Sequence, residues 1–312
     1  MSDSNGSVDL AVTVGDIELS NPILLASGTV GYGEELGELI DLSRLGGIVV
    51  KGLSLEPERG NVPQRIAEVP GGMLNSIGLQ NVGADAFVRR KLPFLRQLDL
   101  KVIANIWGRT VEEYVGVATR LDAADGVDAL ELNVSCPNIK EGGISFGTDP
   151  VQIHAVTAAV RAATDKPLWV KLAPGVTDIG VMALAAEEAG ADALSVANTI
   201  RGMAVHVGHR RPLLATIYGG LSGPSLFPIV LYLLYEVSLV SSLPLIGIGG
   251  VSELDHVLQY LITGATAVQI GTANFYDPMA SQRLVDELAR WCCDEEIPTV
   301  REVIGSLQVG EP

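Results

Sequence analysis

Residues 244–251 read PLIGIGGV, and residues 267–272 read AVQIGT. In both segments an apolar run of strand length ends in glycine, and residues 252–263 between them have helical periodicity. Runs that are apolar on both faces are typical of parallel strands covered by helices. The two segments therefore predict a strand–helix–strand unit of an α/β fold.

The same unit recurs toward the N-terminus. Six further apolar runs predict strands at residues 23–27, 48–52, 102–106, 129–135, 168–172 and 193–199. Helical patterns predict helices at about residues 34–44, 110–124, 150–163, 178–190, 225–242, 252–263 and 276–293. Eight strands separated by crossover helices fit a (β/α)8 TIM barrel better than an open sheet. We expect one domain over residues 1–312.

Two segments lie outside this repeat. Residues 10–20 alternate apolar and polar around Gly15-Asp16, which predicts a β-hairpin that closes the N-terminal mouth of the barrel, with residues 1–9 flexible before it. Residues 53–100 form a long connection after the second barrel strand, with three prolines and the polar run NSIGLQN at 75–81. Long loops in compact domains are usually functional, so we expect this insertion at the active-site face.

Composition limits the function. The chain has 37 acidic and 21 basic residues, a net charge of −16, which argues against nucleic acid and anionic membranes as partners. Three cysteines make no disulfide framework and no Cys/His group has metal-ligand spacing, so we expect no metal. The apolar stretch 225–243 contains a proline and a glutamate and predicts a buried helix. The N-terminus has no targeting signal, so a cytoplasmic protein is expected.

The last two strands predict a phosphate site. Gly249, Gly250, Gly271 and Thr272 stand where these strands leave the barrel, a position that commonly binds phosphate through backbone N–H groups. Such a site suits a nucleotide phosphate such as that of FMN, and Gly223 could close the same pocket. The alternative is that these glycines only make tight turns.

Two lysines end apolar strands. Lys171 lies in WVKLAP (169–174), and Lys51 follows IVV (48–50). A buried ammonium needs an anionic partner, which a flavin supplies because negative charge develops on its ring during reduction. The alternative is a lysine that extends from a strand end to solvent.

Cys136 follows the fourth strand and opens a glycine-containing loop. A single cysteine there can be a nucleophile, a general base or an inert buried residue. Its neighbours Asn133, Ser135 and Asn138 favour a reactive role, because their donors and acceptors suit an amide-rich substrate.

These motifs together resemble a known family. ELNVSCPNIKEGG (131–143) with FGTDP (146–150) closely resembles the signature of class 1 dihydroorotate dehydrogenases, nearest to the 1B form. NSIGLQN (75–81), VKLAP (170–174), ANT (197–199) and both glycine pairs match in the same order. The similarity extends from Leu10 to about Ile304.

The resemblance implies an activity and a site. Dihydroorotate would be oxidised to orotate in de novo pyrimidine biosynthesis, with Cys136 removing a proton from C5 while hydride passes from C6 to N5 of FMN. The implied substrate-binding residues are Lys51, Asn75, Ser76, Ile77, Gly78, Leu79, Asn133, Asn138, Asn198 and Thr199. The implied FMN-binding residues are Ser27, Lys51, Gly52, Asn105, Asn133, Lys171, Ala197, Gly223, Gly249, Gly250, Gly271 and Thr272.

The same resemblance implies a partner. The 1B enzymes pass electrons to NAD through a second subunit that carries FAD and a 2Fe–2S cluster, and class 1 relatives are dimers. This chain has too few cysteines for such a cluster and no G-x-G-x-x-G motif that begins a helix, so we do not expect it to use NAD alone. Fumarate or a quinone is the alternative acceptor.

Other functions remain open at this point. The nearest is a flavin reductase similar to dihydropyrimidine dehydrogenase; a dihydrouridine synthase-like enzyme is disfavoured by the negative charge. A barrel that uses Lys171 as a Schiff base, or one that only binds a nucleotide, would contain no flavin.

Overall fold

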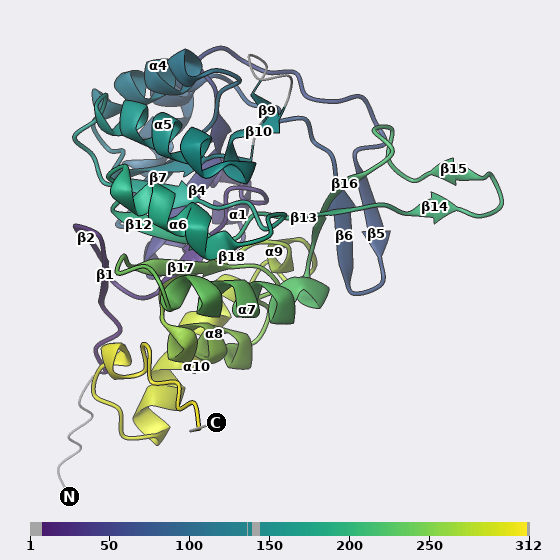
Figure 1. Cartoon of the computed structure of the whole chain (residues 1–312). Coiled ribbons are helices and arrows are strands. Elements are labelled where there is room, and N and C mark those ends of the chain that lie inside the picture. The colour runs from purple at the N-terminus through teal and green to yellow at the C-terminus, as the bar shows by residue number, and fades with distance from the viewer. Residues whose placement is uncertain (1–7, 136, 139–143, 311–312) are drawn as a thin grey trace, which may run out of the picture.

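Eight strands close into a parallel barrel surrounded by helices (Figure 1). The computed structural model describes residues 8–135, 137–138 and 144–310. The barrel strands, in order around the barrel, are β3 (Ile23–Leu25), β4 (Gly47–Leu53), β7 (Lys101–Ile106), β8 (Ala129–Asn133), β11 (Leu168–Lys171), β12 (Ala193–Val196), β17 (Leu245–Ile248) and β18 (Ala265–Ile270), which pairs with β3 again. Each overlaps a predicted strand, and the predicted (β/α)8 barrel is confirmed.

Helices follow the barrel strands and cover them from outside. They are α1 (Glu34–Gly37) with the 3₁₀ turn η1 (Leu42–Arg44), α2 (Ala84–Ala86), α3 (Leu92–Leu95), α4 (Val111–Asp122), η4 (Phe146–Thr148), α5 (Pro150–Arg161), α6 (Ile179–Glu188), η5 (Pro224–Leu226), α7 (Phe227–Ser238), α8 (Leu254–Thr263), α9 (Ala273–Tyr276), α10 (Ala280–Asp294) and η6 (Val300–Glu302). Three helix starts are fixed by side-chain caps: Thr110, Asp149 and Asp178 accept hydrogen bonds from backbone N–H groups of α4, α5 and α6. Where one helix was predicted at 34–44, the side chain of Asp41 instead caps the separate turn η1.

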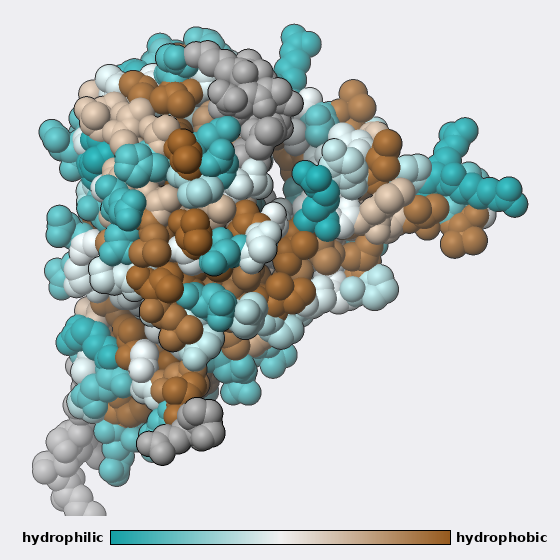
Figure 2. All heavy atoms as spheres, in the orientation of Figure 1, coloured by the Kyte–Doolittle hydropathy of each residue, from teal (hydrophilic) through white to brown (hydrophobic). Residues whose placement is uncertain are grey.

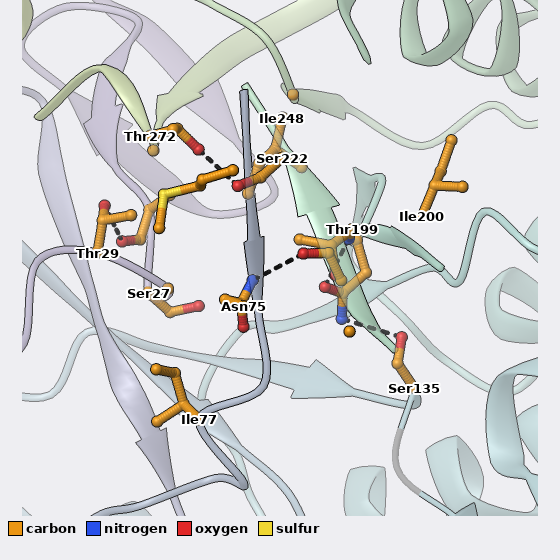
Figure 3. Close-up of a pocket in the computed structure, with 18 of the residues that line it drawn as sticks. Ser27, Thr29, Asn75, Ile77, Ser135, Thr199, Ile200, Ser222, Ile248 and Thr272 are labelled. Atoms are coloured by element: carbon orange, nitrogen blue, oxygen red, sulfur yellow. Dashed lines mark hydrogen bonds between the residues drawn. The ribbon is translucent and has the colours of Figure 1, made fainter. Parts of the chain in front are cut away.

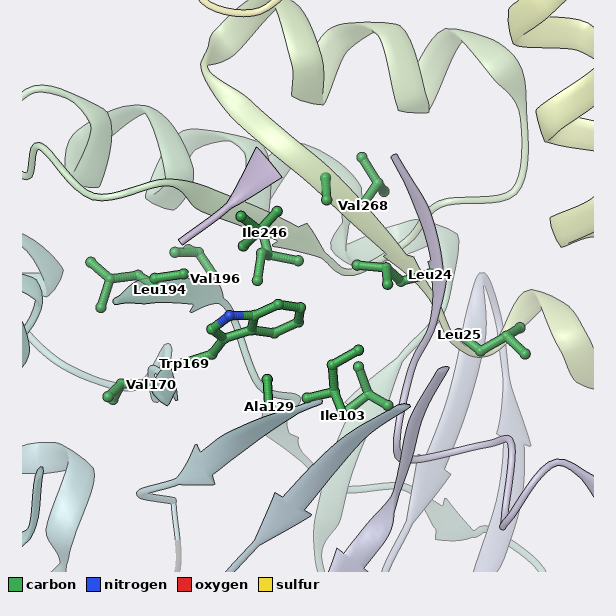
Figure 4. Close-up of a cluster of buried hydrophobic side chains, with 14 of the residues drawn as sticks. Leu24, Leu25, Ile103, Ala129, Trp169, Val170, Leu194, Val196, Ile246 and Val268 are labelled. Carbon is green, nitrogen blue, oxygen red and sulfur yellow. The ribbon is translucent and has the colours of Figure 1, made fainter. Parts of the chain in front are cut away.

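Most of the barrel interior is filled by apolar side chains. Trp169 of β11 is fully buried and lies among apolar residues such as Ile246 and Ile103 (Figure 4). Burying one such aliphatic side chain stabilises a fold by roughly 1.5–3 kcal/mol. The barrel is therefore a packed core, and a ligand has room only at its ends.

The N-terminal hairpin lies where the sequence places it. Its strands β1 (Val12–Val14) and β2 (Ile17–Leu19) pair antiparallel. In each strand the first and last residues are buried and the middle one is exposed. A Cβ on Gly15 at the turn would come within 3.2 Å of the Cβ of Asp192, which directly precedes β12. The hairpin therefore packs at the N-terminal end of the barrel.

The connection at 53–100 is more regular than predicted. It contains the hairpin β5 (Ile66–Val69) and β6 (Gly72–Asn75), then a helical stretch in which α2 continues through a π-helical turn, η2 (Phe87–Lys91), into α3. No helix was predicted within this connection, whereas the structure is helical over residues 84–95. Pro93 and the basic run at 89–91 hide the helical period, and a π turn shifts the apolar positions out of a 3.6-residue repeat.

A second long connection, between β12 and α7, was not predicted. We call it and the connection at 53–100 the two excursions. The second one holds β13 (Ile200–Gly202), β14 (Val205–His206), β15 (Arg211–Pro212) and β16 (Gly219–Ser222). The strand β16 pairs with β6, so both excursions share one four-stranded sheet of order β13-β16-β6-β5. The hairpin β14–β15 projects from the molecule (Figure 1), and its tip carries hydrophilic side chains together with exposed apolar ones (Figure 2), Val207 among them.

Two short strands flank the segment after β8. They are β9 (Pro137–Asn138) and β10 (Ile144–Ser145), and they pair antiparallel. Among the helices in the described part of the chain, none combines the length and apolar character that a membrane crossing requires.

Candidate active site

A cavity of about 910 Å³ opens at the carboxyl ends of the barrel strands. All eight strands contribute wall residues at their ends or just beyond them, and the sheet β13-β16-β6-β5 adds a side wall. Because active sites of such barrels form at this face, the cavity is the candidate active site. Figure 3 shows side chains from both excursions and from several barrel strands converging on it.

The structure brings nearly all of the sequence-predicted site residues into this one cavity. Its wall includes Ser27, Lys51, Gly52, Asn75, Ser76, Ile77, Gly78, Leu79, Asn105, Asn133, Lys171, Ala197, Asn198, Thr199, Gly223, Gly249, Gly250, Gly271 and Thr272. Cys136 lies outside the described residues. The backbone of Asn138 belongs to β9.

One end of the cavity is built from backbone that only glycine fits. Gly250 has a φ of +73°, and a Cβ on it would lie 2.6 Å from the backbone nitrogen of Phe227, where α7 begins. Gly223 has a φ of +116°, and its Cβ would lie 2.6 Å from the Cα of Gly72. The hydroxyl of Thr272 donates to that of Ser222 over 2.8 Å (Figure 3). This hydrogen bond joins the segment just after β18 to the end of β16. Close backbone approach beside a helix N-terminus is the usual form of a phosphate site.

Asparagine side chains line the other end in fixed orientations. The amide nitrogen of Asn198 donates to Asn133 Oδ1 over 3.2 Å and to the hydroxyl of Ser135 over 3.0 Å. Asn133 Oδ1 also accepts from the backbone of Ser135. Across the wall, Asn75 Nδ2 donates to the carbonyl of Gly220 over 3.2 Å (Figure 3). Such preset amides suit a ligand that carries amide groups of its own.

The cavity is cationic although the protein is acidic. Lys51, Lys171 and Arg201 line it, and none of the described residues in its wall is an aspartate or glutamate. Burial, and then the nearby charge of Arg65, lower the pKa of Lys51 below that of an ordinary lysine. A concentration of positive charge in a protein of net charge −16 indicates an anionic ligand.

The partner of Lys171 differs from the sequence interpretation, which sought a buried anion in a ligand. The structure supplies one within the chain, because Lys171 Nζ lies 3.8 Å from Glu131 Oε1 and both side chains are buried. No role was predicted for Glu131 from the sequence.

Sequence reasoning also missed part of the wall. Arg201, Thr216, Tyr218 and Ser222 come from the excursion between β12 and α7. The length of that connection was the available signal, since a βα loop of a barrel usually has two to six residues.

A closed parallel barrel with one large ligand cavity at its carboxyl face defines the class of (β/α)8-barrel enzymes. A family model described as dihydroorotate dehydrogenase matches residues 9–291. The chain belongs to the dihydroorotate dehydrogenase family, as its motifs led us to expect.

Individual relatives agree over nearly the full length. A protein of Trichlorobacter lovleyi is 51% identical over 299 residues, 96% of this chain and 98% of the relative. One of Geobacter sulfurreducens is 52% identical over 301 residues, 96% of this chain and 99% of the relative. One of Geotalea uraniireducens is 50% identical over 302 residues, 97% of this chain and 99% of the relative. All three are named dihydroorotate dehydrogenase B (NAD(+)), catalytic subunit.

Proposed function

We propose that this chain oxidises (S)-dihydroorotate to orotate, a step of de novo pyrimidine biosynthesis, with FMN bound in the barrel cavity. The observation that carries the proposal is the cationic, amide-lined cavity with a glycine-built phosphate end, in a chain about half identical to catalytic subunits of this name. Substrate and cofactor are both anions, which fits a wall whose described residues include three cations and no carboxylate.

The size and the lining of the cavity support FMN as the cofactor. Its volume of about 910 Å³ suits a nucleotide together with a small substrate, since ligand pockets commonly measure roughly 300–1,000 Å³. The phosphate would lie at Gly223, Gly249, Gly250, Gly271 and Thr272. The ring would lie among Ser27, Gly52, Asn105, Asn133, Ala197 and the ammonium groups of Lys51 and Lys171. Bound FMN supplies the acceptor for the hydride.

The remaining polar wall would hold dihydroorotate. Asn75, Asn133, Asn138 and Asn198 would pair with the ring amides, and Lys51 and Thr199 with the carboxylate. The turn formed by Ser76, Ile77, Gly78 and Leu79 would close one side. Fixed side chains of this kind raise the rate by holding the reacting carbon in position.

Cys136 would act as the general base that removes the C5 proton. A thiol has a pKa near ambient pH, which suits proton abstraction under physiological conditions. In the sequence the residue directly follows Ser135, whose hydroxyl accepts a hydrogen bond from Asn198. Nucleophilic attack is not required of it in this role.

The electrons would leave through a partner. The relatives' name, with "B (NAD(+))" and "catalytic subunit", supports a separate subunit and NAD as the acceptor. We propose that this subunit carries FAD and a 2Fe–2S cluster, as the family resemblance implies. We further propose a homodimeric core located in the cytoplasm. Fumarate and quinones are the competing acceptors.

Spectroscopy of the purified protein tests the proposal. We expect a yellow protein whose flavin absorbance bleaches when dihydroorotate is added without oxygen, and recovers with NAD only after the partner subunit is added. A colourless protein that cannot be reconstituted with FMN would overturn it. Bleaching by dihydrouracil rather than dihydroorotate would indicate a dihydropyrimidine dehydrogenase-like reductase instead.

A further inference from the structure

A carboxylate lies beneath the floor of the cavity. Glu131 of β8 is completely buried and is not part of the cavity wall. Its Oε1 accepts from Asn105 Nδ2 at 2.7 Å, and its Oε2 accepts from Ser195 Oγ at 2.8 Å and Gln269 Nε2 at 2.7 Å. Lys171 Nζ lies 3.8 Å from Oε1. Four barrel strands besides β8 thus direct a side chain at this one group.

The surroundings of Glu131 fit an ionised carboxylate. Lys171 has only donors, and Asn105 and Gln269 direct their amide nitrogens at the carboxylate, so three of its four neighbours offer no acceptor to a protonated acid. Gln269 turns its amide nitrogen toward Glu131 although its own buried Oε1 then has no partner among the described residues. A buried charge is tolerated only when it is paired and hydrogen-bonded, so this arrangement is a built site for a negative charge.

Two of the four neighbours reach the ligand. Lys171 and Asn105 line the cavity, whereas Glu131, Ser195 and Gln269 do not. Asn105 is paired in register with Glu131 and directs Nδ2 at it, and its Oδ1 would lie 2.7 Å from a Cβ on Gly52, another wall residue. Glu131 therefore holds one cation and one amide in the orientations that they present to the cavity.

We propose that Glu131 is a positioning residue that sets the reduction potential of the bound flavin, an inference that rests on the proposed function. Its charge offsets that of Lys171, so the ring gains less stabilisation on two-electron reduction than an unpaired lysine would give. Removing the negative charge favours the reduced flavin, and removing the lysine favours the oxidised one.

The test compares the flavin midpoint potential of wild-type holoenzyme and Glu131→Gln at neutral pH, by equilibration with reference dyes. We expect the reduced form to gain about tenfold in Glu131→Gln, which is a potential higher by about 30 mV for a two-electron couple. Ser195→Ala is the matched control, because it removes a hydrogen bond to the same carboxylate without changing charge. Its shift should be clearly smaller, whereas a purely structural role predicts similar shifts in both.

A second pair of variants tests the inference if Glu131→Gln alone fails to fold. Lys171→Gln lowers the potential, and adding Glu131→Gln to it raises the potential again while leaving no unpaired buried charge. The inference is overturned if Glu131→Gln leaves the potential unchanged or lower both in the wild-type protein and in Lys171→Gln. The proposed function is not affected by that result. Loss of flavin from every Glu131 variant also overturns it, because Glu131 would then serve binding. A wild-type protein that binds no flavin instead defeats the proposed function itself.

Discussion

Asn198 and Asn133 are joined side chain to side chain: Nδ2 of Asn198 lies 3.2 Å from Oδ1 of Asn133. Asn133 ends β8 and Asn198 follows β12, so the bond bridges two strand ends on either side of β11. It fixes which atom of each amide faces the cavity, and hence the pattern of donors that a ligand meets.

Removing that bridge should weaken substrate binding more than cofactor binding. In Asn198→Ala the amide of Asn133 loses one partner and can rotate, so we expect KM for dihydroorotate to rise roughly 10–100-fold, from about 1–3 kcal/mol lost at each buried group left unpaired. Steady-state kinetics and the flavin content of the purified variant measure both effects. Ser135→Ala removes only one of the two hydrogen bonds that Asn198 Nδ2 donates and should have a smaller effect. An unchanged KM would show that this amide does not face the substrate.

Replacing the proposed base should abolish turnover without releasing FMN. Positioned proton transfer contributes about 10²–10⁴-fold, so Cys136→Ala should lose kcat by that factor. Flavin reduction in a single turnover checks it. Cys293→Ala, at an exposed position on α10, is the control and should match wild type. Near-wild-type flavin reduction in Cys136→Ala would remove the residue from the mechanism.

The phosphate end should not tolerate a side chain at Gly250. In Gly250→Ala the positive φ alone costs about 1–2 kcal/mol, and the Cβ meets the backbone of Phe227. We expect weaker FMN retention and a lower unfolding temperature. Gly310→Ala is the control, because a Cβ there meets nothing within 4 Å and the residue lies outside the cavity wall. Equal stability of the two variants would contradict the tight approach that the structure shows.

Binding of orotate should weaken at alkaline pH. Lys51 attracts an anion only while protonated, and burial together with Arg65 lowers its pKa from the ordinary 10.5. Affinity is therefore full below the lowered pKa and falls as pH rises through it, earlier than for an exposed lysine. Titration of orotate against the flavin spectrum follows this. Lys51→Arg, whose guanidinium stays charged, should hold its affinity at high pH; an identical decline in both would assign the effect to another group.

The barrel could be predicted because its signal is periodic and strong. Most strand residues are apolar on both faces, and polar residues at the strand ends mark the active-site face, as Asn133 and Lys171 do. Most of the candidate site followed from these positions together with the family motifs.

What could not be predicted depends on contacts distant in the sequence. The strand β16 contains Gly219 and Gly220 and is stabilised by pairing with β6, some 145 residues away. The helix at 84–95 was hidden by its π turn. Glu131 looked like an isolated charge in an apolar strand, because its four partners lie on four other strands.

Because the two excursions share one sheet, neither can keep its strands fully paired without the other. If a related barrel lost the hairpin β5–β6, the strand β16 would keep an open edge, and if it lost the segment from β13 to β16, the edge of β6 would be bare. Such bare edges invite pairing with other chains. Anyone who shortens or transplants this side of the barrel must therefore treat the two stretches as one module, although more than a hundred residues separate them along the chain.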